Sequence, residues 1–193
     1  ALVYAGIFYP PKSVITHILA AMARVRNRLP AQLRPQLHYF GRHEKHVREE
    51  ALRLGVADDV ICHGVVPRKE VFRALKGACL APVITSVEPE ANLIDRGIVT
   101  GKIFEVLNLK TPILLVAPRG SDARLVVEKS NAGAAFTGDD IDGIAEFIYR
   151  ACKGEVYFTF EGRDEWAWPN LIKKLDAYLR EVLERHWGDN VRL

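Results

Sequence analysis

The sequence predicts an α/β domain, a Rossmann-like, doubly wound parallel sheet with helices on both faces and one further helix at its C-terminal end. Short apolar runs, typical of strands buried on both faces, alternate with amphipathic segments of about ten residues, typical of surface helices. Gly55, Gly77 and Gly154 follow such segments at the position where helices commonly end. Because strands separated by helices pair in parallel through right-handed crossovers, the alternation implies the doubly wound topology.

The composition fits one soluble globular domain. The chain has 193 residues, of which 49% are hydrophobic and 26% charged, and no apolar run reaches the roughly 18 residues that a membrane span needs. The net charge of +3 suits an anionic small ligand and is too small to indicate nucleic acid. Cys62, Cys79 and Cys152 are widely spaced in apolar surroundings, which favours buried thiols in a reducing compartment and a cytoplasmic location.

The predicted elements follow one another in regular order. We expect strands over six apolar runs, at residues 1–5, 37–41, 60–65, 79–84, 113–117 and 133–136. Between them we expect helices at about residues 13–27, 43–54, 68–76, 101–111, 122–130, 140–153 and 169–185. Ser13 or Thr16 is expected to cap the first helix. Residues 85–99 show no clear period, so we expect a long loop of the kind that often contacts a ligand.

The stretch from Thr100 to Pro112 carries the strongest chemical signal. It begins a short helix on which Lys102 and Glu105, three residues apart, share one face near the N-terminus. A cation, a carboxylate and the free N–H groups of a helix start would suit a ligand with both phosphates and hydroxyls. Glu105 can only accept hydrogen bonds, so it should face sugar hydroxyls. The alternative is an exposed ion pair on an amphipathic helix, with no ligand.

The architecture directs other candidates to the same place. In doubly wound sheets, ligands bind beyond the carboxyl ends of the strands. Gly6, Gly41 and the segment Val65-Val66-Pro67 all follow predicted strands, as does Lys12 near the start of the first helix. Glycine permits close approach of a ligand to the backbone, and a helix start favours phosphate. The sequence has neither Gly-x-Gly-x-x-Gly nor Gly-Lys-Ser/Thr at this point, which counts against dinucleotide and P-loop sites.

Histidines and acidic residues elsewhere are weaker candidates. His43 and His46 lie three apart on a predicted helix and could bind a metal, but no third ligand is evident. We expect His63, within a predicted strand, to be a hydrogen-bonded core histidine. The acidic residues of the long loop, Glu88, Glu90 and Asp95, could act as acids or bases, although a solvated acidic loop is the simpler interpretation.

Five short motifs, taken together and in order, resemble the C-terminal half of a two-domain GT-B glycosyltransferase, in particular the large retaining group called group 1 or family 4. The resemblance covers about residues 1–155. The motifs are Tyr4-Ala5-Gly6 followed by Lys12; Tyr39-Phe40-Gly41; Ile61-Cys62-His63-Gly64-Val65-Val66-Pro67; Lys102-Ile103-Phe104-Glu105-Val106-Leu107 followed by Pro112; and Asn131-Ala132-Gly133.

The resemblance implies that this half binds the nucleotide-sugar donor of a hexosyltransferase-like enzyme. It implies phosphate contacts at Gly6, Lys12, Gly101 and Lys102, base contacts by the backbone near Val65 and Val66, and ribose contacts by Glu105. Gly41 and Thr100 are expected to belong to the same donor-binding site. Lys12, Lys102 and Glu105 are the residues expected to carry catalysis. Cationic side chains and a helix N-terminus could stabilise the departing diphosphate, so we expect no metal cofactor.

The resemblance also implies a missing partner domain. In this family the acceptor and several catalytic groups come from an N-terminal half, and the last helix crosses back to it. We therefore expect residues 1–155 to form the donor-binding domain and residues 156–193 to form an aromatic segment and helix that pack toward that half. The chain alone should be inactive. The tryptophans around the last helix are also compatible with a peripheral membrane contact of the intact enzyme.

Two positions depart from the family pattern. Ile7 stands where an arginine often follows the first glycine, and Gly97 stands where an acidic residue precedes Glu105 by eight positions. These departures would permit a different function, a non-catalytic Rossmann-like binding module that lost its ligand. Another GT-B enzyme, such as a sugar-nucleotide epimerase, is a third interpretation.

Overall fold

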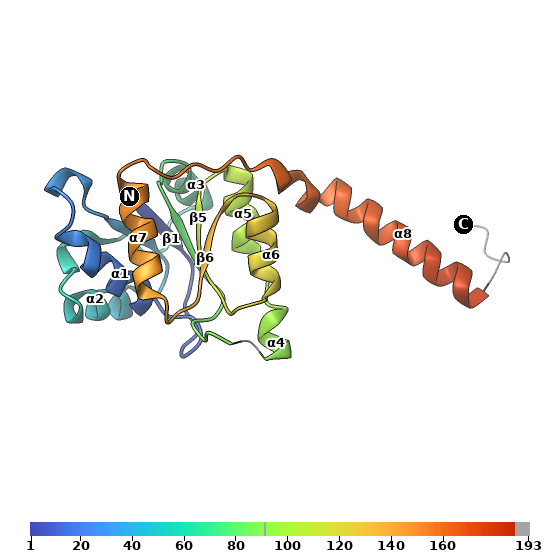
Figure 1. Cartoon of the computed structure of the whole chain (residues 1–193), viewed down its shortest axis with the longest axis horizontal. Helices are drawn as coiled ribbons and strands as arrows, with labels where there is room; N and C mark the ends of the chain where they lie inside the picture. Colours follow the sequence, from blue (N-terminus) through green and yellow to red (C-terminus); the bar gives the residue numbers. More distant parts are fainter. Residues whose placement is uncertain (91, 188–193) are drawn as a thin grey trace.

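The protein folds as the predicted doubly wound α/β domain, followed by a long projecting helix (Figure 1). The structure is a computed structural model, and it describes residues 1–90 and 92–187. The predicted C-terminal segment includes residues 188–193, which lie outside the described residues. The six strands are β1 (Leu2–Ala5), β2 (Leu37–Phe40), β3 (Val60–Cys62), β4 (Ala81–Ile84), β5 (Ile113–Val116) and β6 (Gly133–Phe136).

The strands form two parallel three-stranded sheets with orders β1-β2-β3 and β4-β5-β6. A parallel bridge between Leu2 and Leu80, together with the hydrogen bond from the Val3 N–H to the Leu80 carbonyl, joins β1 to the start of β4. The strands therefore run in the spatial order 3-2-1-4-5-6. The first three strands are added outward on one side of β1, and β4 to β6 are added on the other side. The carboxyl ends of β1 and β4 are therefore the topological switch point of the sheet.

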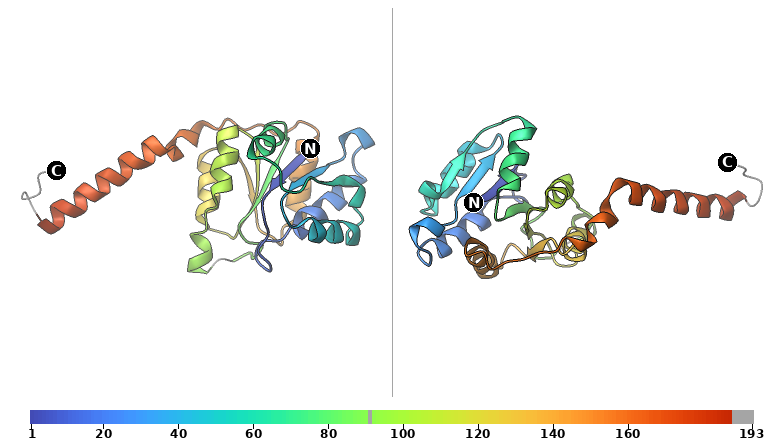
Figure 2. Two further views of the ribbon diagram at one scale, coloured as in Figure 1. Left: turned by 180° about the vertical axis from the view of Figure 1, so that it is seen from behind. Right: turned by 90° about the horizontal axis from the view of Figure 1, so that it is seen from above.

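Two layers of helices cover the two faces of the sheet (Figure 2). The helices are α1 (Thr16–Arg26), α2 (Glu44–Arg53), α3 (Arg68–Lys76), α4 (Leu93–Arg96), α5 (Gly101–Leu109), α6 (Asp122–Lys129) and α7 (Ile141–Cys152). Side chains of α1, α2 and α7 share one buried cluster with alternate strand residues such as Tyr4 and Leu114. Those of α3, α5 and α6 share the other with the intervening residues, such as Val3 and Leu115. The period of two along each strand thus separates the two cores.

Local signals placed some boundaries wrongly. Neither Ser13 nor Thr16 caps α1, because the cap position falls on Ile15, which has no capping side chain. The expected loop at residues 85–99 contains the short helix α4, which is capped by the Asn92 side chain bonding to the Asp95 N–H. α5 ends at Lys110, whose φ of 56° is left-handed, two residues before Pro112. A left-handed conformation is less favourable for lysine than for glycine, so the local sequence does not predict a helix end at this residue.

The C-terminal region first follows the domain and then leaves it. Phe158 packs against the first core cluster, and Phe160 and Trp166 pack against the second. The helix α8 (Trp168–Trp187) then projects away from the body of the protein (Figure 1). Among the described residues, no helix has the length and apolar content needed to cross a membrane.

Candidate functional site

The glycine loop after β1 lies against the first turn of α5, as the sequence predicts. Gly6 has a φ of +136°, a conformation that side chains with a Cβ rarely adopt. A Cβ at Gly6 would stand 2.2 Å from the Nζ of Lys102. The lysine therefore occupies space that only a glycine leaves open, and the two residues form one wall of the switch point.

Gly41 completes this wall from the neighbouring strand. The hydroxyl of Tyr39 donates a 2.9 Å hydrogen bond to the Gly6 carbonyl and accepts one from the His43 N–H at 3.0 Å. A Cβ at Gly41 would meet the Gly6 carbonyl oxygen at 2.2 Å and the Tyr39 hydroxyl at 2.4 Å. The loops after β1 and β2 can approach this closely because both carry glycine at the end of the strand.

A cavity of about 540 Å³ opens beside this wall. Its lining comes from the loop after β1, the end of β4 and the start of α5, namely Ile7, Tyr9, Pro10, Pro11, Lys12, Ser13, Ile84, Thr85, Ile98, Thr100 and Lys102. The predicted residues Lys12, Thr100 and Lys102 thus face one space. Thr85, which the sequence reasoning missed, is 8% exposed, and its hydroxyl has no hydrogen-bond partner within the described ranges. An unpartnered buried hydroxyl in a cavity wall is a group that a ligand could satisfy.

Lys102 is a partly desolvated cation at the helix start. Thr100 caps α5, because its hydroxyl accepts a hydrogen bond from the Lys102 N–H and its carbonyl accepts one from the Ile103 N–H. The Lys102 Nζ lies 4.9 Å from the centre of the Tyr4 ring and 3.5 Å from the Tyr4 hydroxyl. Burial lowers the pKa of Lys102, while the charge of Glu105 acts in the opposite direction. An anion entering the cavity would restore the solvation that this ammonium group lacks.

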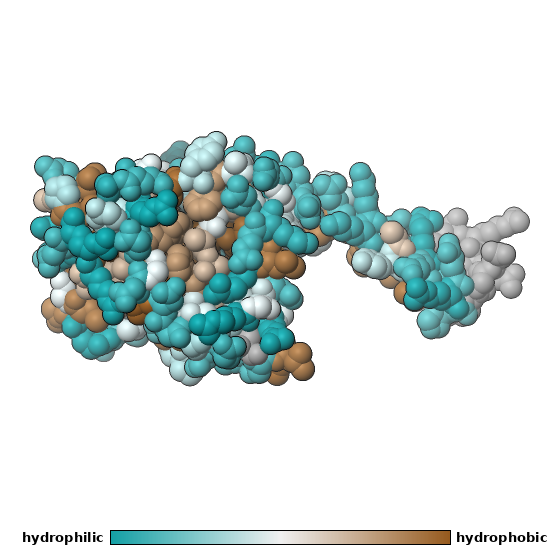
Figure 3. Space-filling model, viewed as in Figure 1, coloured by the Kyte–Doolittle hydropathy of each residue, from teal (hydrophilic) through white to brown (hydrophobic). Residues whose placement is uncertain are grey.

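Lys12 is held by a carboxylate. Its Nζ lies 2.6 Å and 2.9 Å from the two carboxylate oxygens of Asp95 on α4. Asp95 is 3% exposed, so the prediction that it belongs to a solvated acidic loop was wrong. The apolar residues of α4, Leu93 and Ile94, point outward instead and are 88% and 79% exposed, and a hydrophobic spot covers this helix in Figure 3. The Lys12–Asp95 pair anchors α4 beside the cavity, because a buried carboxylate needs a partner.

Glu105 faces the other side of the helix start, toward α3. Its Oε1 accepts a hydrogen bond of 2.6 Å from Arg68, the first residue of α3. The loop that precedes Arg68 contains Val65, which is 70% exposed, and Val66, which packs against the second core cluster. Gly101, the first residue of α5, is exposed. Glu105 and Val65 are therefore accessible to solvent on the α3 side of α5, whereas Lys102 lines the cavity.

His63 differs from its predicted role. β3 ends at Cys62, and although the His63 N–H still bonds to the Tyr39 carbonyl of β2, the His63 side chain is exposed instead of buried. Its ring stacks on Phe40 at 4.3 Å, and its Nε2 lies 2.9 Å from the Nδ1 of His38. The Nδ1 of His43 accepts a hydrogen bond from the Phe8 N–H. Among the described residues, no group of three or more histidine, cysteine, aspartate or glutamate side chains is arranged to hold a metal.

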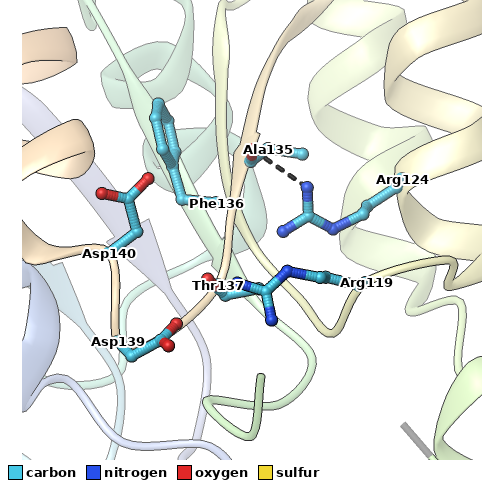
Figure 4. Close-up of a pocket in the computed structure, with 7 residues that line it drawn as sticks. All are labelled: Arg119, Arg124, Ala135, Phe136, Thr137, Asp139 and Asp140. Carbon is cyan, nitrogen blue, oxygen red and sulfur yellow. Dashed lines mark hydrogen bonds between the residues drawn. The ribbon is translucent and has the colours of Figure 1, made fainter. Parts of the chain in front are cut away.

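A second pocket, of about 410 Å³, lies past the ends of β5 and β6 (Figure 4). Arg119 and Arg124 reach into it from one side, and Asp139 and Asp140 lie across from them. Arg124 donates hydrogen bonds to the carbonyls of Ala117, Pro118 and Ala135, and Asp140 caps α7 by accepting from the Gly143 N–H. Arg124 and Asp140 thus have structural partners in this pocket, whereas the cavity at the switch point contains the Thr85 hydroxyl, which has no partner among the described residues.

Comparison with solved structures identifies the fold. The chain superposes on a lipopolysaccharide outer core galactosyltransferase, WaaB, with a TM-score of 0.72 and 17% identity over 94% of this chain and 49% of that one. It matches Anabaena HepE in complex with UDP-glucose with a TM-score of 0.64 and 15% identity over 95% and 48% of the two chains. The chain has the fold of one half of a GT-B glycosyltransferase.

Sucrose-phosphate synthase from Thermosynechococcus elongatus extends the comparison, with a TM-score of 0.66 and 16% identity over 95% of this chain and 46% of that one. The GT-B half-domain therefore spans about half the length of the structures it matches. No protein-family model matches the sequence, and the search of curated proteins found no match. The fold confirms the resemblance suggested by the five sequence motifs, while the roles of individual site residues stay predictions.

Proposed function

We propose that this chain is the donor-binding half of a retaining glycosyltransferase, which transfers a sugar from a nucleoside-diphosphate sugar to an acceptor. The observation that carries the proposal is the meeting of Lys12, Lys102 and the N-terminus of α5 at the cavity beside β1 and β4. The Lys102 ammonium group, the Lys12–Asp95 pair and the positive end of the helix dipole suit a diphosphate, and the switch point is where doubly wound sheets bind ligands. The HepE structures contain UDP and UDP-glucose, so UDP is the first nucleotide to test.

Each predicted residue has a role in this proposal. Lys102 and the first turn of α5, with Thr100 and Gly101, bind the diphosphate, and Gly6 and Gly41 allow its close approach. Glu105 accepts hydrogen bonds from the ribose hydroxyls, and the backbone at Val65 and Val66 lies along the base. As the sugar leaves, negative charge grows on the diphosphate, and each well-placed donor could lower the barrier by about 3 kcal/mol. Lys12 adds to this stabilisation if its ammonium group binds a phosphate oxygen while it is paired with Asp95.

The proposal is tested by nucleotide titration of the chain. We expect one of UDP, GDP and ADP to raise the stability by about 2.7 kcal/mol at 100 times its dissociation constant. Glu105→Ala should weaken this nucleotide about tenfold, since a hydrogen bond to a charged group is lost. Thermal unfolding with and without nucleotide measures the stability gain and calorimetric titration measures the affinity, and Glu128→Ala, at an exposed position on α6, is the matched control. No binding of any of the three would instead favour the non-catalytic module that Ile7 and Gly97 permit.

We also propose that the remaining half of the enzyme supplies the acceptor site, so the chain alone does not transfer sugar. Release of UDP from UDP-glucose by the purified chain would contradict this. Analysis of the products of the intact enzyme separates transfer from epimerisation and shows whether the anomeric configuration is retained. Loss of the intact enzyme's activity on chelation would contradict the expectation of a metal-free site.

The helix α8 fits a role as the contact with that remaining half. Its apolar residues lie on one stripe and are exposed, namely Trp168, Ile172, Leu175, Tyr178, Leu179 and Val182. We expect the double variant Leu175→Glu/Leu179→Glu to leave the melting temperature of the chain unchanged and to lower that of the intact enzyme, because apolar burial is lost only there. Differential scanning calorimetry measures both, with Lys173→Glu on the same helix as the control. Self-association of the chain through this stripe would assign the stripe to a second copy instead.

A further inference from the structure

Glu105 is a ribose acceptor in the proposed function, and the structure gives it one neighbour that no sequence motif includes. Arg68 begins α3, thirty-seven residues earlier in the chain, and its terminal nitrogen lies 2.6 Å from the Oε1 of Glu105. Among the residues that the structure describes, Arg68 is the one side chain that hydrogen-bonds this carboxylate. The contact therefore joins the base-side loop, residues 64–67, to the start of α5.

The guanidinium group of Arg68, whose side chain is 72% exposed, lies over an aromatic ring of its own helix. Its Cζ lies 4.8 Å from the centre of the Phe72 ring, one helical turn further along α3. Phe72 is partly buried and packs against the second core cluster, which also contains Ile103, Val106 and Leu107 of α5. A cation over an aromatic ring gains electrostatic attraction, and a planar guanidinium loses little freedom on stacking. Arg68 thus links Glu105 to a ring that is fixed by the core.

The geometry suits orientation of the carboxylate. A long glutamate side chain that is 41% exposed samples several rotamers unless a partner selects one. Arg68 bonds Oε1 and leaves Oε2 without a hydrogen-bond partner within residues 1–90 and 92–187. A carboxylate has about four acceptor positions on its two oxygens, so the bond to Arg68 leaves capacity for two hydroxyl donors.

We propose that Arg68 is a positioning residue, which stacks on Phe72 and holds the Glu105 carboxylate in the orientation that accepts the ribose hydroxyls of the donor nucleotide. This inference rests on the proposed function, since it assigns a residue to the same site. A residue that bound the phosphates directly would affect every nucleoside diphosphate alike. Arg68 acts on binding through Glu105, so its effect requires the ribose hydroxyls that Glu105 contacts.

The experiment compares UDP with 2′,3′-dideoxy-UDP, which has the same base and diphosphate and lacks both hydroxyls. Calorimetric titration of the chain measures both affinities for the parent protein, Arg68→Met and Arg68→Lys. We expect Arg68→Met to weaken UDP about fivefold, the upper range for a partly exposed ion pair, and to leave dideoxy-UDP unchanged. Arg68→Lys should recover part of the UDP affinity, because it keeps the charge but not the planar fork.

Arg73→Met is the matched control, because Arg73 is exposed on the same helix and forms no ion pair in the described part of the chain. An equal loss for UDP and dideoxy-UDP would mean that Arg68 acts on the phosphates or base, and it would overturn the proposal. An unchanged UDP affinity in Arg68→Met would overturn it as well. Failure of the parent protein to bind UDP, GDP or ADP would instead refute the proposed function, and this inference with it.

Discussion

Replacing Lys102 with methionine is expected to weaken UDP binding about 100-fold, because a charged donor to the diphosphate is lost. The same change should raise the melting temperature of the unliganded chain by about 2–4 °C, the effect of ~1 kcal/mol in a domain of this size. Burial lowers the pKa of Lys102, so its charged form is disfavoured in the folded chain. Methionine loses the contact of the ammonium group with the Tyr4 ring but fills similar space and removes the desolvated charge, a replacement that often stabilises.

Calorimetric titration and differential scanning calorimetry measure the two effects on the same samples. Lys129→Met, an exposed lysine of α6, controls for the change in net charge. The stability gain should shrink at high pH, because the folded chain carries Lys102 with a lowered pKa and neutralises it before the unfolded chain does. A Lys102→Met chain that binds UDP as well as the parent would remove Lys102 from the phosphate site. One that melts lower than the parent would show that the ammonium group stabilises the empty fold.

The order and type of the elements could be predicted from the sequence because each depends on local pattern. Strands such as Ile113–Val116 are apolar throughout, and helices such as α7 carry apolar residues at helical spacing. The parallel topology then follows from the alternation. The meeting of Gly6 with Lys102 could also be anticipated, since both positions follow from strand order and the switch-point rule.

Partners that are distant in sequence could not be predicted in this way. Lys12 and Asp95 are separated by 83 residues, and the loop that carries Asp95 has neither a helical nor a strand period. Arg68 has the pattern of an ordinary exposed residue at a helix start, and its relation to Glu105 depends on how α3 and α5 lie on one face of the sheet. Thr85 follows an apolar strand, and a single hydroxyl there does not alter the hydrophobic pattern, so the sequence does not mark Thr85 as a site residue.

The wrong prediction for His63 comes from the position at which a strand ends. The apolar run from Val60 to Val65 suggests a strand that buries His63, yet β3 ends at Cys62, and the side chain of His63 is exposed like that of Ile61 two residues earlier. Past that point the backbone turns at Gly64, whose φ of +68° is left-handed, and His63 moves to the surface against Phe40. Hydrophobicity alone does not reveal where a parallel neighbour ends, because the partner strand sets the limit.

The second large effect is expected at Arg124. Arg124→Met should destabilise the fold by about 3 kcal/mol and lower the melting temperature by about 6–12 °C. Its guanidinium nitrogens donate to three carbonyls, those of Ala117, Pro118 and Ala135, at 2.8–3.1 Å. These bonds tie α6 to the carboxyl ends of β5 and β6, and Figure 4 shows the one to Ala135. Methionine fills similar space but removes these bonds, so that the Pro118 carbonyl keeps only the 3.4 Å bond from the Ser121 N–H, and Ala117 is fully buried.

Arg119→Met is the matched control, since Arg119 lines the same pocket but pairs with Glu90 as an exposed ion pair. Exposed pairs contribute little, so this variant should melt close to the parent protein in the same calorimetric scan. UDP affinity should survive both changes at temperatures below the transition, because neither arginine lines the cavity at the switch point. If Arg124→Met instead kept its stability and lost nucleotide binding, the ligand site would lie beyond β5 and β6, and the pocket in Figure 4 would replace the one beside Lys102.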